Sequence, residues 1–324
     1  MADSRYIRAI NQALGDAMEA DPAVIVMGED IAEAGGSFKA TKGLLDRFGP
    51  DRVRDTPISE LTITGAAVGA ALTGLKPVVE IMFMDFVTLA MDAIVNQAAK
   101  SRFMFGGQAS VPMVVRLPHG GGLNAGPQHS QCLEAWFAHV PGLKVLCPAT
   151  VEDAYSLLRA AIDDPDPVIF VEHKGLYGLA GDLPDEPARA EIGMARLARA
   201  GTDVTLVSYG AAVGTCMEAA RQLEQRGASA EVIDLRSLQP WDKSAVLASL
   251  ARTHRVVVVH EAVRDFGIGA EIAATLGEDG FDELDAPVIR VGAPFMPSPF
   301  ARSLEQHFIP DAERVVASAL RTLE

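Results

Sequence analysis

Short apolar runs that alternate with helical patterns are the feature that most restricts the fold of this chain. In the first half, strands are expected at Val24–Met27, Pro77–Phe83, Val111–Leu117, Lys144–Cys147 and Val168–Glu172. Apolar residues at helical spacing predict helices between them, at Tyr6–Ala20, Leu61–Leu75, Asp85–Phe103, Ser130–Phe137 and Val151–Ile162. Nearly continuous apolar strands separated by helices are typical of a parallel sheet that is covered on both faces. The sequence therefore predicts an α/β fold.

A break in this pattern predicts a second domain. Tyr177–Ile192 is rich in glycine, proline and acidic residues, a composition suited to a linker. Beyond it the alternation restarts, with strands expected at Asp203–Ser208, Glu231–Leu235, Val256–Val259 and Val288–Val291. Helices are expected at Val213–Arg226, Lys243–Ala251, Ile268–Leu276 and Ala312–Leu323. We expect two domains, at residues 1–187 and 200–324, of which the second is the smaller α/β domain.

Composition and charge restrict the partners and the compartment. The net charge is −15 and no run of Lys or Arg occurs, so nucleic acid is not an expected partner. Apolar runs such as Val256–Val259 are far shorter than the roughly 18 residues that a membrane span requires. Met1–Arg5 lacks the pattern of a signal peptide, which predicts a cytoplasmic protein. Cys132, Cys147 and Cys216 have no CxxC spacing, so we expect small buried residues rather than a zinc site or disulfides.

The segment Thr56–Glu60 places a glutamate at the start of a predicted Gly-rich helix. Gly65 and Gly69 each cost that helix about 0.5–1 kcal/mol relative to alanine, which indicates that a backbone or a ligand lies close to it. Simple packing explains each glycine equally well. A glutamate in the first turn also stabilises its own helix, so a catalytic and a structural role both stay open for Glu60.

Two further segments are candidates for a site. Phe83 and Phe86 stand near a predicted strand end, where open α/β sheets bind ligands, although two phenylalanines there are also typical core residues. His129 follows the loop His119–Gly126, which has four glycines but lacks the spacing and lysine of a phosphate-binding loop. A histidine beside such a loop can transfer protons, with His119 as a second polar contact. Hydrogen bonding to backbone is the alternative for either histidine.

These segments, in this order, resemble the β subunit of the thiamine-diphosphate-dependent 2-oxo acid dehydrogenases. The resemblance covers essentially the whole chain and is specific at Asp55–Glu60, Gly65–Gly69, Phe86, Asn96–Lys100, Gln128–Gln131 and Pro141–Val145. It implies a parallel-sheet, pyrimidine-binding N-terminal domain and a C-terminal domain of the transketolase type. It also implies an oxidoreductase that decarboxylates a 2-oxo acid and acylates the lipoyl-lysine of a core transacylase.

Residue by residue, the resemblance assigns roles to five positions. Glu60 matches the glutamate that activates the cofactor's pyrimidine, because a carboxyl group on the ring nitrogen favours the tautomer that removes the thiazolium proton. Phe86 matches the aromatic residue packed against that ring, and Ile58 and Met82 match apolar contacts beside it. His129 matches the histidine that passes the acyl group to the lipoyl arm.

The resemblance further implies metal ions. A structural potassium ion is bound in family members mostly through backbone oxygens, and the matching positions here are Met113, Ala161, Ile162, Asp164 and Asp166. Pro165 interrupts this stretch, and Leu89 stands where some relatives have glutamine. Magnesium and the diphosphate require a GDG segment followed by a pair of asparagines, and Gly277–Gly280 does not match that pattern.

The missing diphosphate motif implies partners. An α subunit would supply it, in an α2β2 assembly. The core transacylase would dock through its lipoyl domain and its basic subunit-binding module, with candidate contacts at Glu261, Asp265, Glu305 and Glu324.

Two alternatives to this function stay open. An acetoin dehydrogenase β subunit would use the same residues, and Glu172–Tyr177 and Pro297–Phe300 look closer to acetoin and branched-chain relatives. A non-catalytic scaffold subunit is the other alternative, and it is disfavoured because it needs neither Glu60 nor His129.

Overall fold

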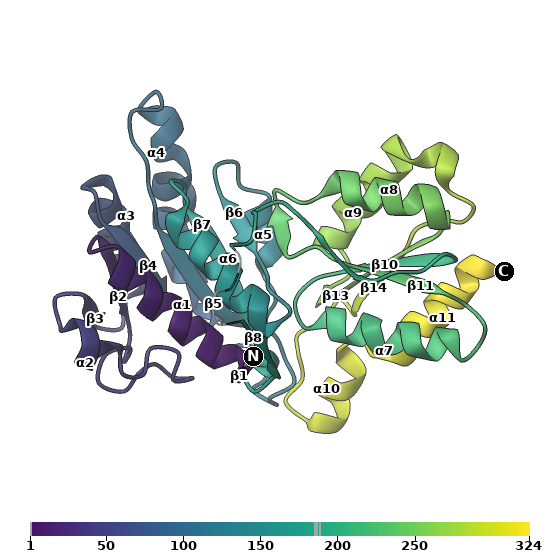
Figure 1. Cartoon of the computed structure of the whole chain (residues 1–324), viewed down its shortest axis with the longest axis horizontal. Helices are drawn as coiled ribbons and strands as arrows, with labels where there is room; N and C mark the ends of the chain where they lie inside the picture. The colour runs from purple at the N-terminus through teal and green to yellow at the C-terminus, as the bar shows by residue number, and fades with distance from the viewer. Residues whose placement is uncertain (1, 185–186, 188) are drawn as a thin grey trace. The chain divides into compact units, whose positions relative to one another are not determined.

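A computed structural model describes residues 2–184, 187 and 189–324, which form two compact units. The first comprises Met1–His119 and Trp136–Ile192, and the second comprises Gly120–Ala135 and Gly193–Glu324. Both are α/β structures built on mainly parallel sheets, which confirms the predicted fold class (Figure 1). Within the described residues, no helix combines the length and the apolar character that a membrane span requires.

The sheet of the first unit is parallel. Its strands lie in the order β6-β7-β5-β4-β2-β3. They are β2 (Val24–Gly28), β3 (Val53–Asp55), β4 (Lys76–Glu80), β5 (Val114–His119), β6 (Lys144–Leu146) and β7 (Val168–His173). Every residue of β5 and β7 is buried, as expected for central strands covered on both faces.

Helices cover this sheet. On one face α1 (Tyr6–Ala20) and α6 (Val151–Asp163) pack together and enclose the larger core cluster (Figure 1). Next to β4, α3 (Glu60–Leu72) packs against η1 (Met84–Ala90) and η2 (Asp92–Ala98). The remaining short helices are α2 (Leu44–Phe48), α4 (Ala99–Met104), α5 (Glu134–Ala138) and η3 (Lys174–Leu176).

Three local predictions for this unit were wrong. The single helix expected at Asp85–Phe103 is a 3-10 segment, a π-helical segment and α4 in succession, because apolar periodicity over a few turns does not reveal the hydrogen-bond offset. The helix expected at Ser130–Phe137 is only α5. In the predicted linker, Ala180–Leu183 forms β8, which pairs antiparallel with β1 (Ala2–Arg5). Within that linker, Asp185, Glu186 and Ala188 lie outside the described residues.

The second unit has the sheet order β14-β13-β10-β11-β9, and only β9 runs antiparallel to its neighbour. Its strands are β9 (Arg196–Arg199), β10 (Val204–Ser208), β11 (Ala230–Asp234), β12 (Ser237–Gln239), β13 (Val256–Val263) and β14 (Ile289–Ala293). On one face lie α7 (Ala212–Glu224) and α11 (Ala312–Leu323), and on the other α8 (Lys243–Thr253) and α9 (Ile268–Asp279) (Figure 1). The helices η4 (Phe281–Glu283) and α10 (Arg302–Phe308) complete it. Strand β9 was not predicted, because its sequence Arg-Leu-Ala-Arg has the charged character of an edge strand.

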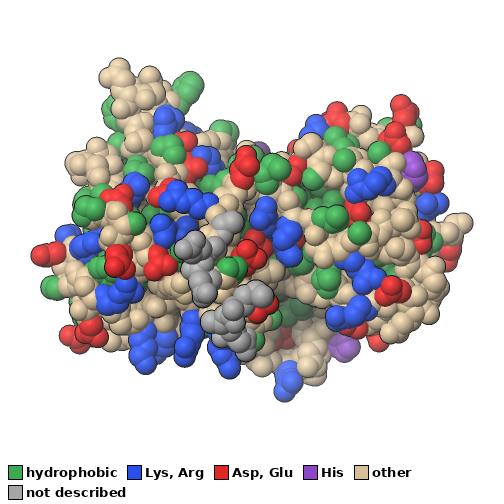
Figure 2. Space-filling view, viewed as in Figure 1, with side chains coloured by type: hydrophobic (Ala, Val, Ile, Leu, Met, Phe, Trp, Pro, Cys, Tyr) green, Lys and Arg blue, Asp and Glu red, His purple; other side chains and the backbone are tan. Residues whose placement is uncertain are grey.

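Charges of both signs share the surface despite the net charge of −15. On the face shown in Figure 2, Lys and Arg side chains are interspersed with Asp and Glu. Exposed pairs such as Arg47 and Glu19, with 3.2 Å between Nη2 and Oε2, contribute at most about 1 kcal/mol each. Such exposed pairs therefore add little to the stability of the fold.

Candidate functional site

Glu60 is the first residue of α3, and its side chain is buried, with 5% of the residue exposed. Ser59 precedes it, but the Ser59 hydroxyl donates to Thr62 Oγ1 at 2.8 Å and does not cap the helix. Within the described part of the chain, no group donates a hydrogen bond to the Glu60 carboxylate or forms an ion pair with it. A buried carboxylate without a partner costs free energy unless a ligand supplies the missing donor.

Glu29 lies close enough to Glu60 for the two carboxylates to interact. Burial raises the pKa of Glu29, and the charges of Glu60 and Asp30 raise it further. The sequence did not indicate this pairing, because the two residues lie on different elements, 31 positions apart. The raised pKa means that Glu29 holds a proton more readily than an exposed acid does.

The predicted aromatic and apolar contacts lie on segments next to Glu60. Phe86 is inside η1, which packs against α3, and its ring meets Phe83 edge to face with 5.8 Å between centroids. Because β4 ends at Glu80, Phe83 and Phe86 are beyond the strand rather than in it. Met82 is half-buried between β4 and η1. Ile58 is 83% exposed, so its side chain is available to a ligand or a partner chain.

A buried ion cluster underlies this region and was not predicted. The guanidinium of Arg116, on β5, is fully buried and binds Glu172 through two hydrogen bonds, of 2.6 and 2.8 Å. It also donates to Glu80 at 2.5 Å, and the Tyr177 hydroxyl donates to Glu172 at 2.8 Å. Burial raises the pKa of Glu172, while Arg116 opposes that shift. Burial alone lowers the pKa of Arg116, but the two carboxylates outweigh it and keep the guanidinium charged.

His129 belongs to the second unit and is half-buried at the end of a tight turn. Its backbone N–H donates to Gly126 O at 3.2 Å, which closes the turn Gly126–His129. Gly126 has a φ of 79°, a left-handed conformation that glycine adopts at little cost. The predicted loop position of His129 is therefore correct, and the turn presents its side chain outside any helix or strand.

Beside this turn, the second unit contains a cavity of about 390 Å³. Its walls are mostly apolar, with Leu133, Val263 and Phe295 among the lining residues. The hydroxyls of Ser130 and Ser298, which also line it, are buried and have no hydrogen-bond partner in the described residues. Cavities of this size with a few convergent polar groups are typical of small-molecule sites.

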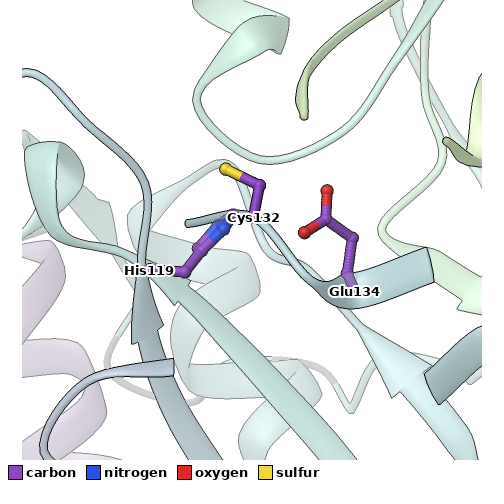
Figure 3. A group of neighbouring side chains, drawn as sticks. All are labelled: His119, Cys132 and Glu134. Atoms are coloured by element: carbon purple, nitrogen blue, oxygen red, sulfur yellow. The ribbon is translucent and has the colours of Figure 1, made fainter. Parts of the chain in front are cut away.

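Figure 3 shows three further polar side chains, His119, Cys132 and Glu134. His119 is the last residue of β5 and is 2% exposed, with its ring edge-on to His173 at 5.2 Å between centroids. Cys132 is half-buried and its Sγ lies 3.9 Å from Glu261 Oε1, whereas Cys147 and Cys216 are buried as predicted. Glu134, at the start of α5, accepts a hydrogen bond of 2.7 Å from the Tyr209 hydroxyl.

The residues that match the potassium site gather where α6 ends and β7 begins. Asp164 accepts two hydrogen bonds of 2.6 Å from Lys144 Nζ, and Asp166 is paired with Arg102. The backbone oxygens of Met113 and Ala161 accept from Val168 and Asp164, at 2.9 and 3.4 Å, and Ile162 is buried. Since both carboxylates already have cationic partners, backbone oxygens are the groups left for a bound cation.

One expected surface contact was wrong. Glu305 was a candidate for docking the core transacylase, but it is 2% exposed and its carboxylate accepts from the backbone N–H of Asn124 at 3.1 Å. Glu261 likewise accepts from the Gly121 N–H at 2.6 Å. These contacts join residues 181 and 140 positions apart, so no local sequence signal could have revealed them.

Comparisons with known proteins agree with this architecture. The transketolase pyrimidine-binding domain matches residues 3–179, and the transketolase C-terminal domain matches residues 193–315. A solved structure described as a split-gene transketolase, inactive beta4 tetramer, superposes with a TM-score of 0.81 at 23% identity and covers 99% of both chains. That likeness supports the fold.

Curated relatives are much closer in sequence. The pyruvate dehydrogenase E1 component subunit beta-2, mitochondrial, of Oryza sativa subsp. japonica is 48% identical over 97% of this chain and 84% of its own length. The acetoin:2,6-dichlorophenolindophenol oxidoreductase subunit beta of Bacillus subtilis (strain 168) is 45% identical, over 97% of this chain and 96% of its own. The pyruvate dehydrogenase E1 component subunit beta of Rhizobium meliloti (strain 1021) is 44% identical, over 98% and 69%. The chain belongs to the family of β subunits of the thiamine-dependent 2-oxo acid dehydrogenases, built from a transketolase-type pyrimidine-binding domain and C-terminal domain.

Proposed function

We propose that this β subunit completes a thiamine diphosphate site with an α subunit, decarboxylates a 2-oxo acid and passes the acyl group to lipoyl-lysine on a core transacylase. The observation that carries the proposal is Glu60 itself, a buried residue beside Glu29 whose carboxylate has no hydrogen-bond donor among the described residues. A protonatable ring nitrogen would supply the donor that this carboxylate lacks. Phe86, Met82 and Ile58 would contact the same ring.

Individual residues of the chain have separate roles in this reaction. When bound, thiamine diphosphate supplies the nucleophilic carbon that attacks the substrate carbonyl. Glu60 holds the pyrimidine nitrogen and shares a proton with it, and Glu29 lies beside this pair. His129 exchanges a proton with the acceptor during acyl transfer, a role that typically contributes about 10²–10⁴-fold to its own step.

Substitution of Glu60 tests the assignment. In the reconstituted complex, Glu60→Gln should leave assembly intact and lower the decarboxylation rate by about 100-fold or more, because the amide cannot take up the ring proton. Glu33→Gln, at an exposed acid of the same unit, is the matched control and should keep the wild-type rate. Near-normal turnover of Glu60→Gln would contradict the proposal.

The proposed α subunit is tested by binding. The chain lacks a GDG segment, so we expect the diphosphate and its magnesium ion to be held mainly by the α subunit in an α2β2 complex. Calorimetry should detect tight, magnesium-dependent binding of thiamine diphosphate only when both chains are present. Tight binding to this chain alone would contradict the proposal that the α subunit holds the diphosphate.

A second candidate is the cleavage of acetoin, and the similarity to an acetoin oxidoreductase β subunit supports it. The same residues would act, but acetoin cleavage breaks a carbon–carbon bond without loss of CO2. Release of CO2 from pyruvate or branched-chain 2-oxo acids, compared with acetoin consumption by the same complex, separates the two.

A further inference from the structure

Two carboxylates elsewhere in the second unit bind the loop that carries His129. Glu261, on β13, accepts the Gly121 N–H at 2.6 Å, and Glu305, on α10, accepts the Asn124 N–H at 3.1 Å. Backbone hydrogen bonds to carboxylates are charge-assisted and stronger than those to neutral acceptors. The two carboxylates therefore fix the first half of the loop to regular elements of the C-terminal domain.

The loop needs such anchors because of its backbone. Gly120, Gly122 and Gly126 have φ values of 87°, 87° and 79°, and Asn124 has a φ of 55°. Four left-handed residues in so short a segment include three glycines, whose backbone freedom makes the ordered conformation entropically costly. Without external contacts this segment would sample many conformations, and the turn that presents His129 would not be defined.

A third contact lies at the turn itself. The ring of Phe300 lies directly against Gly126, so closely that a Cβ added to Gly126 would overlap the ring atoms. Gly126 is also the residue whose carbonyl closes the turn to the His129 N–H. Although Phe300 is 66% exposed, the covered part of its ring rests on the backbone at the base of the turn. The ring therefore restricts the one residue on which the position of His129 depends.

We infer that Glu261, Glu305 and Phe300 are positioning residues that hold the loop in the conformation in which His129 acts, so that the C-terminal domain controls acyl transfer although it carries no cofactor motif. The inference rests on the proposed role of His129. It extends that role to residues of the same unit that are far from His129 in the sequence. Glu305 is the most buried of the three, and its Oε2 accepts from the loop at Asn124 N–H.

Hydrogen–deuterium exchange on the full chain tests the anchors directly. Glu305→Ala should increase the exchange rate of peptides within residues 120–131 by about 10-fold or more, the range expected for loss of a hydrogen bond to a charged group. Phe300→Ala should increase it as well, because the ring contact with Gly126 is lost. Glu305→Gln keeps an acceptor oxygen and should restore slower exchange. Phe281→Ala, at a 72% exposed phenylalanine of η4, is the matched control and should leave the loop unchanged. Wild-type exchange of the loop in both alanine variants would overturn the inference.

The catalytic consequence is tested in the reconstituted complex. Two rates are measured for each preparation. One is the acylation of a lipoyl domain, and the other is decarboxylation with an artificial electron acceptor. We expect His129→Ala, Phe300→Ala and Glu305→Ala all to lower the ratio of acyl transfer to decarboxylation, with Glu305→Gln close to wild type. If His129→Ala lowers the ratio and the anchor variants do not, the positioning role is wrong even if the loop exchanges faster. If His129→Ala leaves the ratio unchanged, the role of His129 fails, and with it the catalytic inference; the exchange experiment still reports whether the anchors hold the loop.

Discussion

The two sheets both bury an ionisable side chain, and they do so by opposite means. In the N-terminal sheet, Arg116 stays charged because Glu80 and Glu172 surround it with hydrogen bonds. In the C-terminal sheet, His260 on β13 is fully buried and has no carboxylate partner among the described residues, and burial lowers its pKa from 6.5 to about 4. A covered parallel sheet can therefore hold such a group either with a complete set of counter-charges or in its neutral form.

The surroundings of His260 explain why it is neutral. Its Nδ1 donates to the backbone oxygen of Ala262 at 3.0 Å, which partly offsets the shift in pKa, while the charge of Arg290 adds to it. Its ring is stacked on Tyr209. Gly269 leaves room for the ring, because a Cβ there would come within 2.8 Å of His260 Nε2. Of these contacts only the Ala262 oxygen favours an imidazolium, and burial outweighs it.

Removal of Arg116 should have the largest effect, because it leaves two carboxylates buried without their cation. Arg116→Met is expected to destabilise the N-terminal unit by about 3–5 kcal/mol. Native-state hydrogen exchange should show the loss in β4, β5 and β7. Arg47→Met removes an exposed ion pair of the same unit and should cost at most about 1 kcal/mol. An equal loss of protection in β10 and β13 would contradict this expectation, because the cluster would then stabilise both sheets.

Lowering the pH should have the next largest effect on stability, through His260. Its native pKa is below its unfolded value, so between pH 6.5 and about 4 the unfolded chain binds a proton that the native chain does not. Stability is therefore unaffected above this window and falls as the pH falls through it, by about 3 kcal/mol in total at roughly 1.4 kcal/mol per pH unit.

His260→Gln, which cannot titrate, isolates this contribution. The difference between wild type and variant in the free energy of unfolding of the C-terminal unit should change with pH inside the window and be constant above it. A difference that is flat from pH 7 to pH 4 would mean that the imidazole finds a counter-charge as effective as those of Arg116.

Removal of a helix cap should have the smallest effect, and each unit has one such cap to compare. Thr150 accepts the Asp153 N–H at the start of α6, and Asp311 accepts the Arg314 N–H at the start of α11. Thr150→Ala and Asp311→Ala should each cost about 1 kcal/mol in their own unit. Only the Asp311 effect should shrink in high salt, because that cap also places a negative charge at the helix N-terminus. Equal salt dependence in chemical denaturation would argue against a charge component.

Local patterns predicted the parts of the molecule that depend on neighbours in sequence. Apolar strands and helical spacing identified both sheets, and the position of Glu60 before a Gly-rich run identified the start of α3. The ion cluster escaped prediction because Arg116 meets Glu172 across 56 residues and Glu80 across 36. Strand β8 escaped because its partner, β1, is at the other end of the domain. The anchors of the His129 loop are more distant still, so the sequence indicates the histidine but not what holds it.

The path of the chain through its two units has a consequence for anyone who builds chimeras of this family. Gly120–Ala135 leaves the first unit, joins the second and is followed by a return to the first. A single crossover in the segment between the two sheets would combine the His129 loop of one parent with Glu261, Phe300 and Glu305 of the other. Recombinants that keep the loop and its anchors together also need breakpoints near residues 119 and 136. The coding segments that must come from the same parent are therefore not contiguous in the gene.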